Sequence, residues 1–366
     1  MWSRRVWAAR VLAMGLAAKR RLAAQGAAPA RVDDSAARIA PGSFGNLQGS
    51  ITPSANFFLR NHHREPDLSM ADWRLRVEGM VASPLELSFS DLLEAPLTRL
   101  EAVLECAGND AGGGVLVANG LWEGVALSYF LQQAAPAARA DRVLLVGADR
   151  GSLLEGTPPF PYARVVALNA AMAPEAMVAF RLNDQFLPRR HGFPARAMQA
   201  AQYAMNSVKW LERIVVLGPD DRPAEFYASG MDLLYRRTYH KEIPAADSRV
   251  SGILVKSRIV TPAARARLAS GPHTISGLAW AGANRVASVQ VSVDGAKTWR
   301  PARLEGAPRP FRWVRWNLPW EATPGEHRLV SRAQDSLGNL QPLVRDPNRR
   351  DGYELNHCAA VMCSVK

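Results

Sequence analysis

Hydrophobic and polar positions between residues 55 and 218 follow a mixture of the two-residue period of strands and the 3.6-residue period of helices. The strand-like segments are residues 73–79, 100–106 and 142–147. The helix-like segments are residues 90–93, which begin with a capping serine, residues 125–133, and a helical turn at residues 174–180 before a further strand-like stretch. The mixture predicts an α+β domain over residues 55–218.

The pattern changes after residue 251. Short apolar segments recur at regular intervals and are separated by turn sequences such as Asp294-Gly295 and Pro324-Gly325. These segments are residues 275–278, 285–293, 313–318 and 326–334. The spacing predicts an all-β sandwich of immunoglobulin-like size over residues 251–366. Polar, proline-containing sequence over residues 219–250 predicts a linker between the two domains.

The first 30 residues have a different composition. Arg4 and Arg5 precede an Ala/Leu-rich stretch, which a second basic cluster follows. A paired arginine before a weakly hydrophobic segment predicts a twin-arginine export signal and a periplasmic protein, whereas the interruption by Arg10 leaves a disordered leader as the alternative. Outside the first 30 residues, no segment is apolar for the ~20 residues that a membrane span requires, so we expect no span in the mature chain.

The formal net charge is +12. The arginines are scattered through apolar segments and form no block, and no nucleic-acid recognition motif occurs, so we expect no nucleic-acid partner. An anionic substrate and an acidic protein partner explain the charge equally well.

The chain has three cysteines, which is too few for a disulfide framework. Cys106 ends an apolar run and precedes a Gly-Asn turn, so we expect it at the edge of a domain, where its thiolate can reach a metal. Cys358 and Cys363 lie in a predicted final strand, where burial is the favoured interpretation and metal binding the alternative.

Several motifs accompany Cys106 in a fixed order. They are Phe-Phe-Leu-Arg-Asn-His at residues 57–62, Leu-Glu-Cys-Ala-Gly-Asn at 104–109, Leu-Pro-Arg-Arg-His-Gly-Phe-Pro-Ala-Arg at 187–196, Ser-Val-Lys-Trp-Leu at 207–211, and Gly-Asn-Leu-Gln-Pro at 338–342. This ordered set resembles the sulfite oxidase family of molybdopterin-dependent oxidoreductases, in its bacterial sulfite dehydrogenase-like form. The resemblance extends from Phe57 almost to the C-terminus.

The resemblance implies a molybdopterin cofactor, with the Cys106 thiolate as the protein ligand to molybdenum. The residues that match the family's pterin-binding positions are Asn61, His62, Cys106, His191, Arg196, Ser207 and Lys209. Basic and imidazole groups suit this role because the pterin carries a phosphate. The resemblance also implies a homodimer formed through the C-terminal domain.

For the reaction, the resemblance assigns Cys106, Arg60 in the substrate pocket and Tyr239 in the linker as catalytic residues. It implies oxidation of sulfite or a related small sulfur oxyanion by oxygen-atom transfer. Because the chain carries no haem motif, we expect no haem in it and expect an external acceptor, such as a c-type cytochrome.

Three features depart from the family pattern. Asp110 follows Asn109, where sulfite-oxidising members carry arginine, the loop before residues 121–125 is shorter than usual, and Ala200-Ala201 replace a Pro-Gly turn. A pocket with one positive charge fewer should bind a dianion more weakly. Two alternatives therefore stay open: a sulfoxide or N-oxide reductase on the same scaffold, and a noncatalytic pterin-binding interaction protein.

Overall fold

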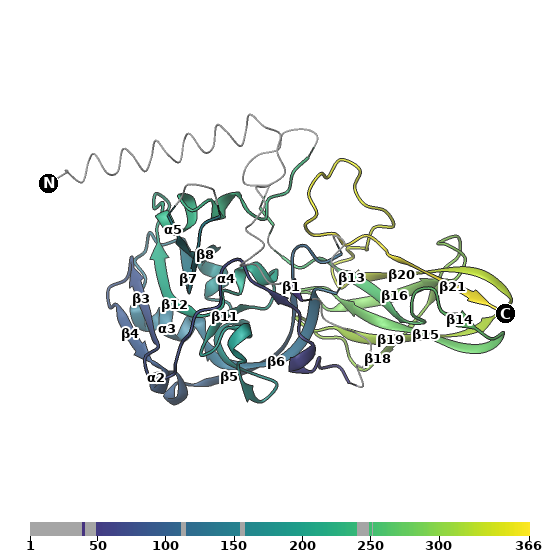
Figure 1. The fold of residues 1–366 in the computed structure, drawn as a ribbon, viewed down its shortest axis with the longest axis horizontal. Coiled ribbons are helices and arrows are strands. Elements are labelled where there is room, and N and C mark those ends of the chain that lie inside the picture. The colour runs from purple at the N-terminus through teal and green to yellow at the C-terminus, as the bar shows by residue number, and fades with distance from the viewer. Residues whose placement is uncertain (1–38, 41–48, 111–114, 154–157, 240–248, 251) are drawn as a thin grey trace.

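The computed structural model describes residues 39–40, 49–110, 115–153, 158–239, 249–250 and 252–366. The predicted export signal lies outside the described residues, and so do residues 240–248 of the predicted linker. In Figure 1 the chain forms an α+β part, drawn in purple to teal, and a β-rich part, drawn in green to yellow. The mixed and the all-β hydrophobic patterns correspond to these two parts. Among the described residues, no helix combines the length and apolar character that crossing a bilayer requires.

The α+β part contains two five-stranded sheets. The first has the order β10-β9-β6-β5, with β11 also pairing with β9, and all its pairs are antiparallel. Its strands are β5 (Leu97–Glu105), β6 (Val117–Ala126), β9 (Ala176–Leu182), β10 (Gln185–Phe186) and β11 (Arg196–Gln199). The sheet matters for the site because β5 ends immediately before Cys106.

The second sheet has the order β4-β3-β12-β7-β8, and its β3–β12 pair is parallel. Its strands are β3 (Arg74–Gly79), β4 (Leu85–Ser88), β7 (Arg142–Gly151), β8 (Phe160–Ala167) and β12 (Leu211–Leu217). Short elements cover and connect the sheets. These are β1 (Ile39–Ala40), β2 (Leu59–Arg60), α2 (Phe89–Glu94), α3 (Leu127–Ala134), α4 (Leu168–Ala171), α5 (Ala224–Tyr227), and the 3-10 turns η1 (Ser54–Asn56), η2 (Arg189–His191), η3 (Ala204–Asn206) and η4 (Met231–Leu233).

Two local predictions need correction. The helix predicted from Ser90 begins one residue earlier, at Phe89, because Ser88 is the capping residue and forms a reciprocal capping box with Asp91. The helical turn predicted at residues 174–180 is wrong, because Ala176–Leu182 form strand β9. Nearly every β9 residue is buried, so the strand lacks the alternation that distinguishes a strand from a helix in sequence.

The β-rich part consists of two sheets packed around one hydrophobic core that includes Trp316, Leu329 and Val291. One sheet has the order β13-β15-β19-β18 and the other β14-β21-β20-β16-β17. The strands are β13 (Lys256–Thr261), β14 (Arg267–Leu268), β15 (Gly271–Trp280), β16 (Val286–Ser292), β17 (Arg300–Pro301), β18 (Arg303–Glu305), β19 (Val314–Ala322), β20 (Gly325–Asp335) and β21 (Ala360–Val365). Inward-facing residues alternate along β19, as expected for a strand with one buried face.

The two parts share an apolar contact. A separate buried cluster contains Val103 and Tyr203 from the α+β part together with Leu278, Trp280 and Trp313 from the β-rich part. The end of β5, which leads to Cys106, is therefore packed directly against the second part.

Candidate functional site

One cavity, which opens to solvent, gathers the chemically active residues of the α+β part. The thiol and the polar or charged side chains of its lining come from several segments that are far apart in the sequence. These residues are Arg60, Asn61, His62, Cys106, Asp149, Tyr162, His191, Arg196, Ser207, Lys209 and Tyr235. Every residue predicted from the family motifs lines this cavity except Tyr239.

Cys106 lies in the turn that follows β5, and its side chain is almost completely buried at the cavity wall. Its amide donates to the Leu116 carbonyl at 2.9 Å, and its carbonyl accepts from the Asn109 amide at 2.9 Å. Burial raises the pKa of the thiol, while a backbone hydrogen bond at Gly108 and the charge of Arg60 oppose this shift. The thiol therefore keeps its proton in the cofactor-free protein, and a metal ion that binds here has to displace that proton.

A basic wall, formed by His191, Arg196 and Lys209, lines the same cavity as the thiol. The Arg196 guanidinium is fixed by donation to the carbonyls of His191 at 3.0 Å and Ser207 at 2.8 Å. Burial lowers the pKa of Arg196 to about 9, and burial together with the charge of Arg196 lowers the pKa of Lys209 to about 7. The positive charges of Arg196 and Lys209 repel each other, so an anion bound between the two side chains is stabilised.

His191 contributes a neutral ring to the basic wall. Burial, assisted by the charges of Lys209 and Arg196, lowers its pKa to about 3. The ring therefore offers one hydrogen-bond donor and one acceptor at neutral pH.

Asn61 and Ser207 connect the wall to its surroundings. The Asn61 side-chain oxygen accepts from Lys209 Nζ, and its amide nitrogen donates to Glu65 at 3.1 Å. Ser207 Oγ accepts from the Gln199 amide at 3.0 Å. Both polar side chains are buried, so their orientation is set by the protein before any ligand binds.

His62 lies deep in the cavity between two tyrosines. Its Nε2 is 2.7 Å from the Tyr235 hydroxyl, and its ring stacks on Tyr162 with 4.9 Å between the ring centres. Burial, with the charges of Arg60 and His63, lowers the pKa of His62 well below 6.5, and burial raises the pKa of Tyr235 well above 10. A protonated phenol and a neutral imidazole therefore share one hydrogen bond.

The structure places Tyr239, the tyrosine expected beside the metal, outside the lining of the cavity. Among the described residues, the linker tyrosine that lines the cavity is Tyr235, four residues earlier. Tyr239 instead pairs by a backbone bridge with Arg349, whose guanidinium lies 5.5 Å from the centre of the tyrosine ring.

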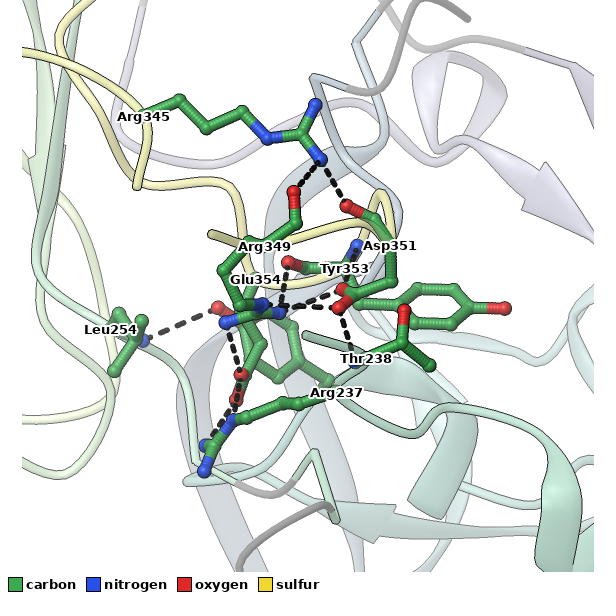
Figure 2. Close-up of polar contacts among 9 residues, drawn as sticks. Arg237, Thr238, Leu254, Arg345, Arg349, Asp351, Tyr353 and Glu354 are labelled. Carbon is green, nitrogen blue, oxygen red and sulfur yellow. Dashed lines mark hydrogen bonds and ion pairs between the residues drawn. The ribbon is translucent and has the colours of Figure 1, made fainter. Parts of the chain in front are cut away.

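Contacts with residues 345–354, which we call the C-terminal segment, explain this placement, and Figure 2 shows them. The Thr238 amide donates to Asp351 at 2.7 Å, and Arg237 forms a two-point ion pair with the Glu354 carboxylate. Arg349 in turn donates to Asp351 at 2.7 Å. These bonds hold residues 237–239 against the second part of the molecule rather than against the cavity.

Sequence reasoning missed three further polar residues of the cavity lining, Asp149, Tyr162 and Tyr235. Burial raises the pKa of Asp149 to about 7, against the influence of Lys209, and its Oδ1 has no hydrogen-bond partner among the described residues. The sequence does contain a signal for Asp149, because this acidic residue closely follows the apolar run 142–147. In the structure the side chain of Asp149 is almost fully buried. Tyr235 lies in the same linker motif as Tyr239 and could not be distinguished by spacing.

The lining fits a molybdopterin cofactor on three independent grounds. Cys106 supplies a soft sulfur donor, which molybdenum bound by dithiolene sulfurs accepts as a further ligand. The guanidinium and ammonium groups of the basic wall suit a ligand that carries a phosphate. The orphaned Asp149 oxygen can accept a hydrogen bond from a ring N–H.

The other two cysteines lie elsewhere. Cys358 and Cys363 are free and buried near and within β21, as their favoured interpretation predicted. Within the described part of the chain, no group of three or more His, Cys, Asp or Glu side chains is arranged to hold a metal ion.

Comparison with known proteins assigns both parts of the chain. Residues 62–224 match the family described as oxidoreductase molybdopterin binding domain, and residues 248–348 match the Mo-co oxidoreductase dimerisation domain. Sulfite oxidase of Gallus gallus is 31% identical over 327 residues, covering 80% of this chain and 68% of that protein. The NADPH nitrate reductase of Emericella nidulans is 29% identical, and the match covers 81% of this chain but 39% of that protein.

A solved structure shares the same fold. The sulfane dehydrogenase SoxCD from Paracoccus pantotrophus has 29% sequence identity and a TM-score of 0.75, covering 87% of this chain and 82% of that one. The chain spans between 57% and 68% of the length of the four vertebrate sulfite oxidases from chicken, mouse, human and macaque.

Proposed function

The chain belongs to the sulfite oxidase family of molybdopterin-dependent oxidoreductases, and we propose that it oxidises sulfite or a related small sulfur oxyanion, passing electrons to an external cytochrome. The proposal rests on the cavity, which is lined by the Cys106 thiol, Arg60 and the basic wall together. When bound, the cofactor supplies oxygen-atom transfer and accepts the two electrons of the oxidation. Family membership makes the chain an enzyme of this class.

Cys106 would hold the molybdenum, while the basic wall, Asn61, Ser207 and Asp149 would hold the pterin. Arg60 then remains for the substrate. Its guanidinium donates only to the neighbouring Asn61 carbonyl at 3.2 Å and forms no ion pair among the described residues. An unpaired, half-buried cation beside the thiol binds and orients an anionic substrate.

Tyr235 and His62 would orient the substrate's oxygen atoms. The Tyr235 hydroxyl and His62 Nε2 share one hydrogen bond, whose direction depends on the imidazole tautomer, and the phenolic oxygen can accept a further hydrogen bond from the cavity.

The test is a comparison of both reaction directions. Purified protein of known molybdenum content is assayed with sulfite and an artificial electron acceptor, and in parallel with a sulfoxide and with nitrate plus a reduced dye. We expect turnover with sulfite and the acceptor. Turnover only with sulfoxide or nitrate and the reduced dye would overturn the proposal in favour of a reductase.

A second candidate substrate is sulfane sulfur. Asp110 stands where sulfite-oxidising members carry arginine and is absent from the cavity lining, so the described cavity has one cation fewer for a dianion. The structural neighbour from Paracoccus pantotrophus is a sulfane dehydrogenase. Including a persulfide substrate in the same assay panel separates the candidates by their kcat/KM values.

We also propose that the protein is exported to the periplasm and dimerises through an immunoglobulin-like sandwich. The paired arginines at the N-terminus support export, and the match of residues 248–348 to a dimerisation domain supports self-association. Cell fractionation tests the location. Light scattering on the purified protein tests the dimer, and a monomer at micromolar concentration would contradict it.

A further inference from the structure

A buried charge cluster joins the metal-binding turn to the β-rich part. We name it the turn clamp. It consists of Glu105 and Asp110, which flank the turn, and of Lys256, Arg258 and Trp280 from β13 and β15. Lys256 Nζ lies 2.6 Å from Glu105 Oε1 and 3.0 Å from Asp110 Oδ2. The side chains of Lys256 and Glu105 are 1% and 0% exposed, so water does not compete for this ion pair.

Both oxygens of Glu105 have partners. Oε1 accepts from Lys256 Nζ and from Asn109 Nδ2 at 2.9 Å, and Oε2 accepts from Trp280 Nε1 at 2.7 Å. Two of these three donors belong to the β-rich part. The carboxylate of the residue immediately before Cys106 is therefore held mainly by the second part of the molecule.

The backbone of the turn is held in the same way. The Glu354 amide, from the C-terminal segment shown in Figure 2, donates to the Ala107 carbonyl at 2.8 Å. Asp110 has φ +72°, a left-handed conformation that is unfavourable for most residues, and its carboxylate forms ion pairs with Lys256 and Arg258. These contacts stabilise both the start and the end of the turn that presents the thiol.

We propose that Lys256 is a positioning residue for Cys106, through which the β-rich part sets the orientation of the molybdenum-binding thiolate. The proposal rests on the proposed role of Cys106 as the metal ligand. Lys256 itself does not line the cavity, and it acts through Glu105, Asn109 and Asp110. The second part of the molecule would thus complete the active site as well as serving association.

Three variants test the proposal. Lys256→Met removes the central cation. The double variant Lys256→Met/Glu105→Gln also removes the carboxylate that would otherwise be left unpaired, so it guards against unfolding of the single variant. Arg312→Met is the matched control, because Arg312 pairs with Glu101 on the same strand β5 at 2.6 Å, also between the two parts but away from the turn.

Two measurements report on the turn without using activity. Hydrogen exchange in cofactor-free, full-length protein follows the amides of Cys106 and Asn109, and peptide mapping follows the rate at which iodoacetamide alkylates Cys106. The molybdenum-to-protein ratio of the loaded enzyme is the third readout. We expect both Lys256 variants to exchange these amides roughly tenfold faster or more, because local opening of the turn becomes easier. They should also alkylate faster and retain less molybdenum, while Arg312→Met matches the wild type.

Unchanged exchange and alkylation at the turn in a folded Lys256 variant would overturn the proposal. Equal acceleration in Arg312→Met would also overturn it, since a general loss of contact between the parts would then be the cause. A wild-type protein that binds no molybdenum would refute the proposed function instead, and the exchange data would still decide whether Lys256 orders the turn.

Discussion

Replacing Arg60 by glutamine tests whether this side chain binds an anionic substrate. The Arg60→Gln variant keeps a hydrogen-bond donor at this position but removes the positive charge that faces the cavity. Because Arg60 has no ion pair among the described residues, the substitution breaks no salt bridge and should leave the fold intact. The stability of the variant should therefore remain close to that of the wild type.

The expected decrease in kcat/KM follows from the hydrogen bond that the substitution removes. A hydrogen bond to a charged group contributes roughly 1.5 to 3 kcal/mol. If Arg60 binds the sulfite oxyanion, kcat/KM should fall by roughly 10- to 150-fold, since each 1.4 kcal/mol corresponds to about a factor of ten. An uncharged substrate should lose far less.

Steady-state kinetics with sulfite at constant ionic strength provide the measurement, with rates expressed per molybdenum. Arg190→Gln is the matched control, because Arg190 is half exposed, lies 3.4 Å from Glu65 and does not line the cavity. A similar loss in both variants would indicate a general electrostatic effect. A normal kcat/KM for sulfite combined with reduced molybdenum content would show that Arg60 serves the pterin, and would refute the reasoning.

Three further predictions address the remaining site residues. Cys106→Ser should abolish sulfite turnover and leave the circular dichroism spectrum unchanged; retained turnover would exclude this thiol as the metal ligand. Tyr235→Phe removes one hydrogen bond, which contributes about 0.5 to 1.5 kcal/mol, and should lower kcat/KM roughly 2- to 13-fold. Tyr239→Phe should have little effect on kcat/KM. A larger loss of kcat/KM in Tyr239→Phe than in Tyr235→Phe would support the predicted role of Tyr239. The pKa of His191 is lowered to about 3 in the folded, cofactor-free protein. Between pH 6.5 and 3 the unfolded chain therefore binds a proton that the folded chain does not. The free energy of unfolding should fall with decreasing pH by up to ~1.4 kcal/mol per pH unit. His191→Gln should flatten this dependence in denaturant titrations, and an unchanged slope would contradict the neutral state.

The motifs that carry the family resemblance predicted most of the polar residues of the cavity lining. Asn61, His62, His191, Arg196 and Lys209 each lie in a short segment with a specific arrangement of neighbours, and the structure brings all of them to one space. Such motifs are readable in sequence because a turn or a strand end places adjacent side chains in a defined way.

The choice between two linker tyrosines could not be made from sequence. Tyr235 and Tyr239 differ in their partners rather than in their local sequence. Tyr235 is buried against His62, whereas the ion pairs of the C-terminal segment draw residues 237–239 away. The same limit applied to strand β9, where burial on both faces removed the alternation on which the prediction depended.

The sequence alone determined the order of the two domains and their mixed and all-β patterns. It also determined which cysteine ends an apolar run before a Gly-Asn turn. These features depend on residues close together in the chain. Only the tertiary structure decided that Asp149 faces the cavity and that Lys256 reaches Glu105 across 151 positions. Such contacts form when burial removes water from charged groups that then require each other as partners. No local pattern specifies which distant residue that partner is.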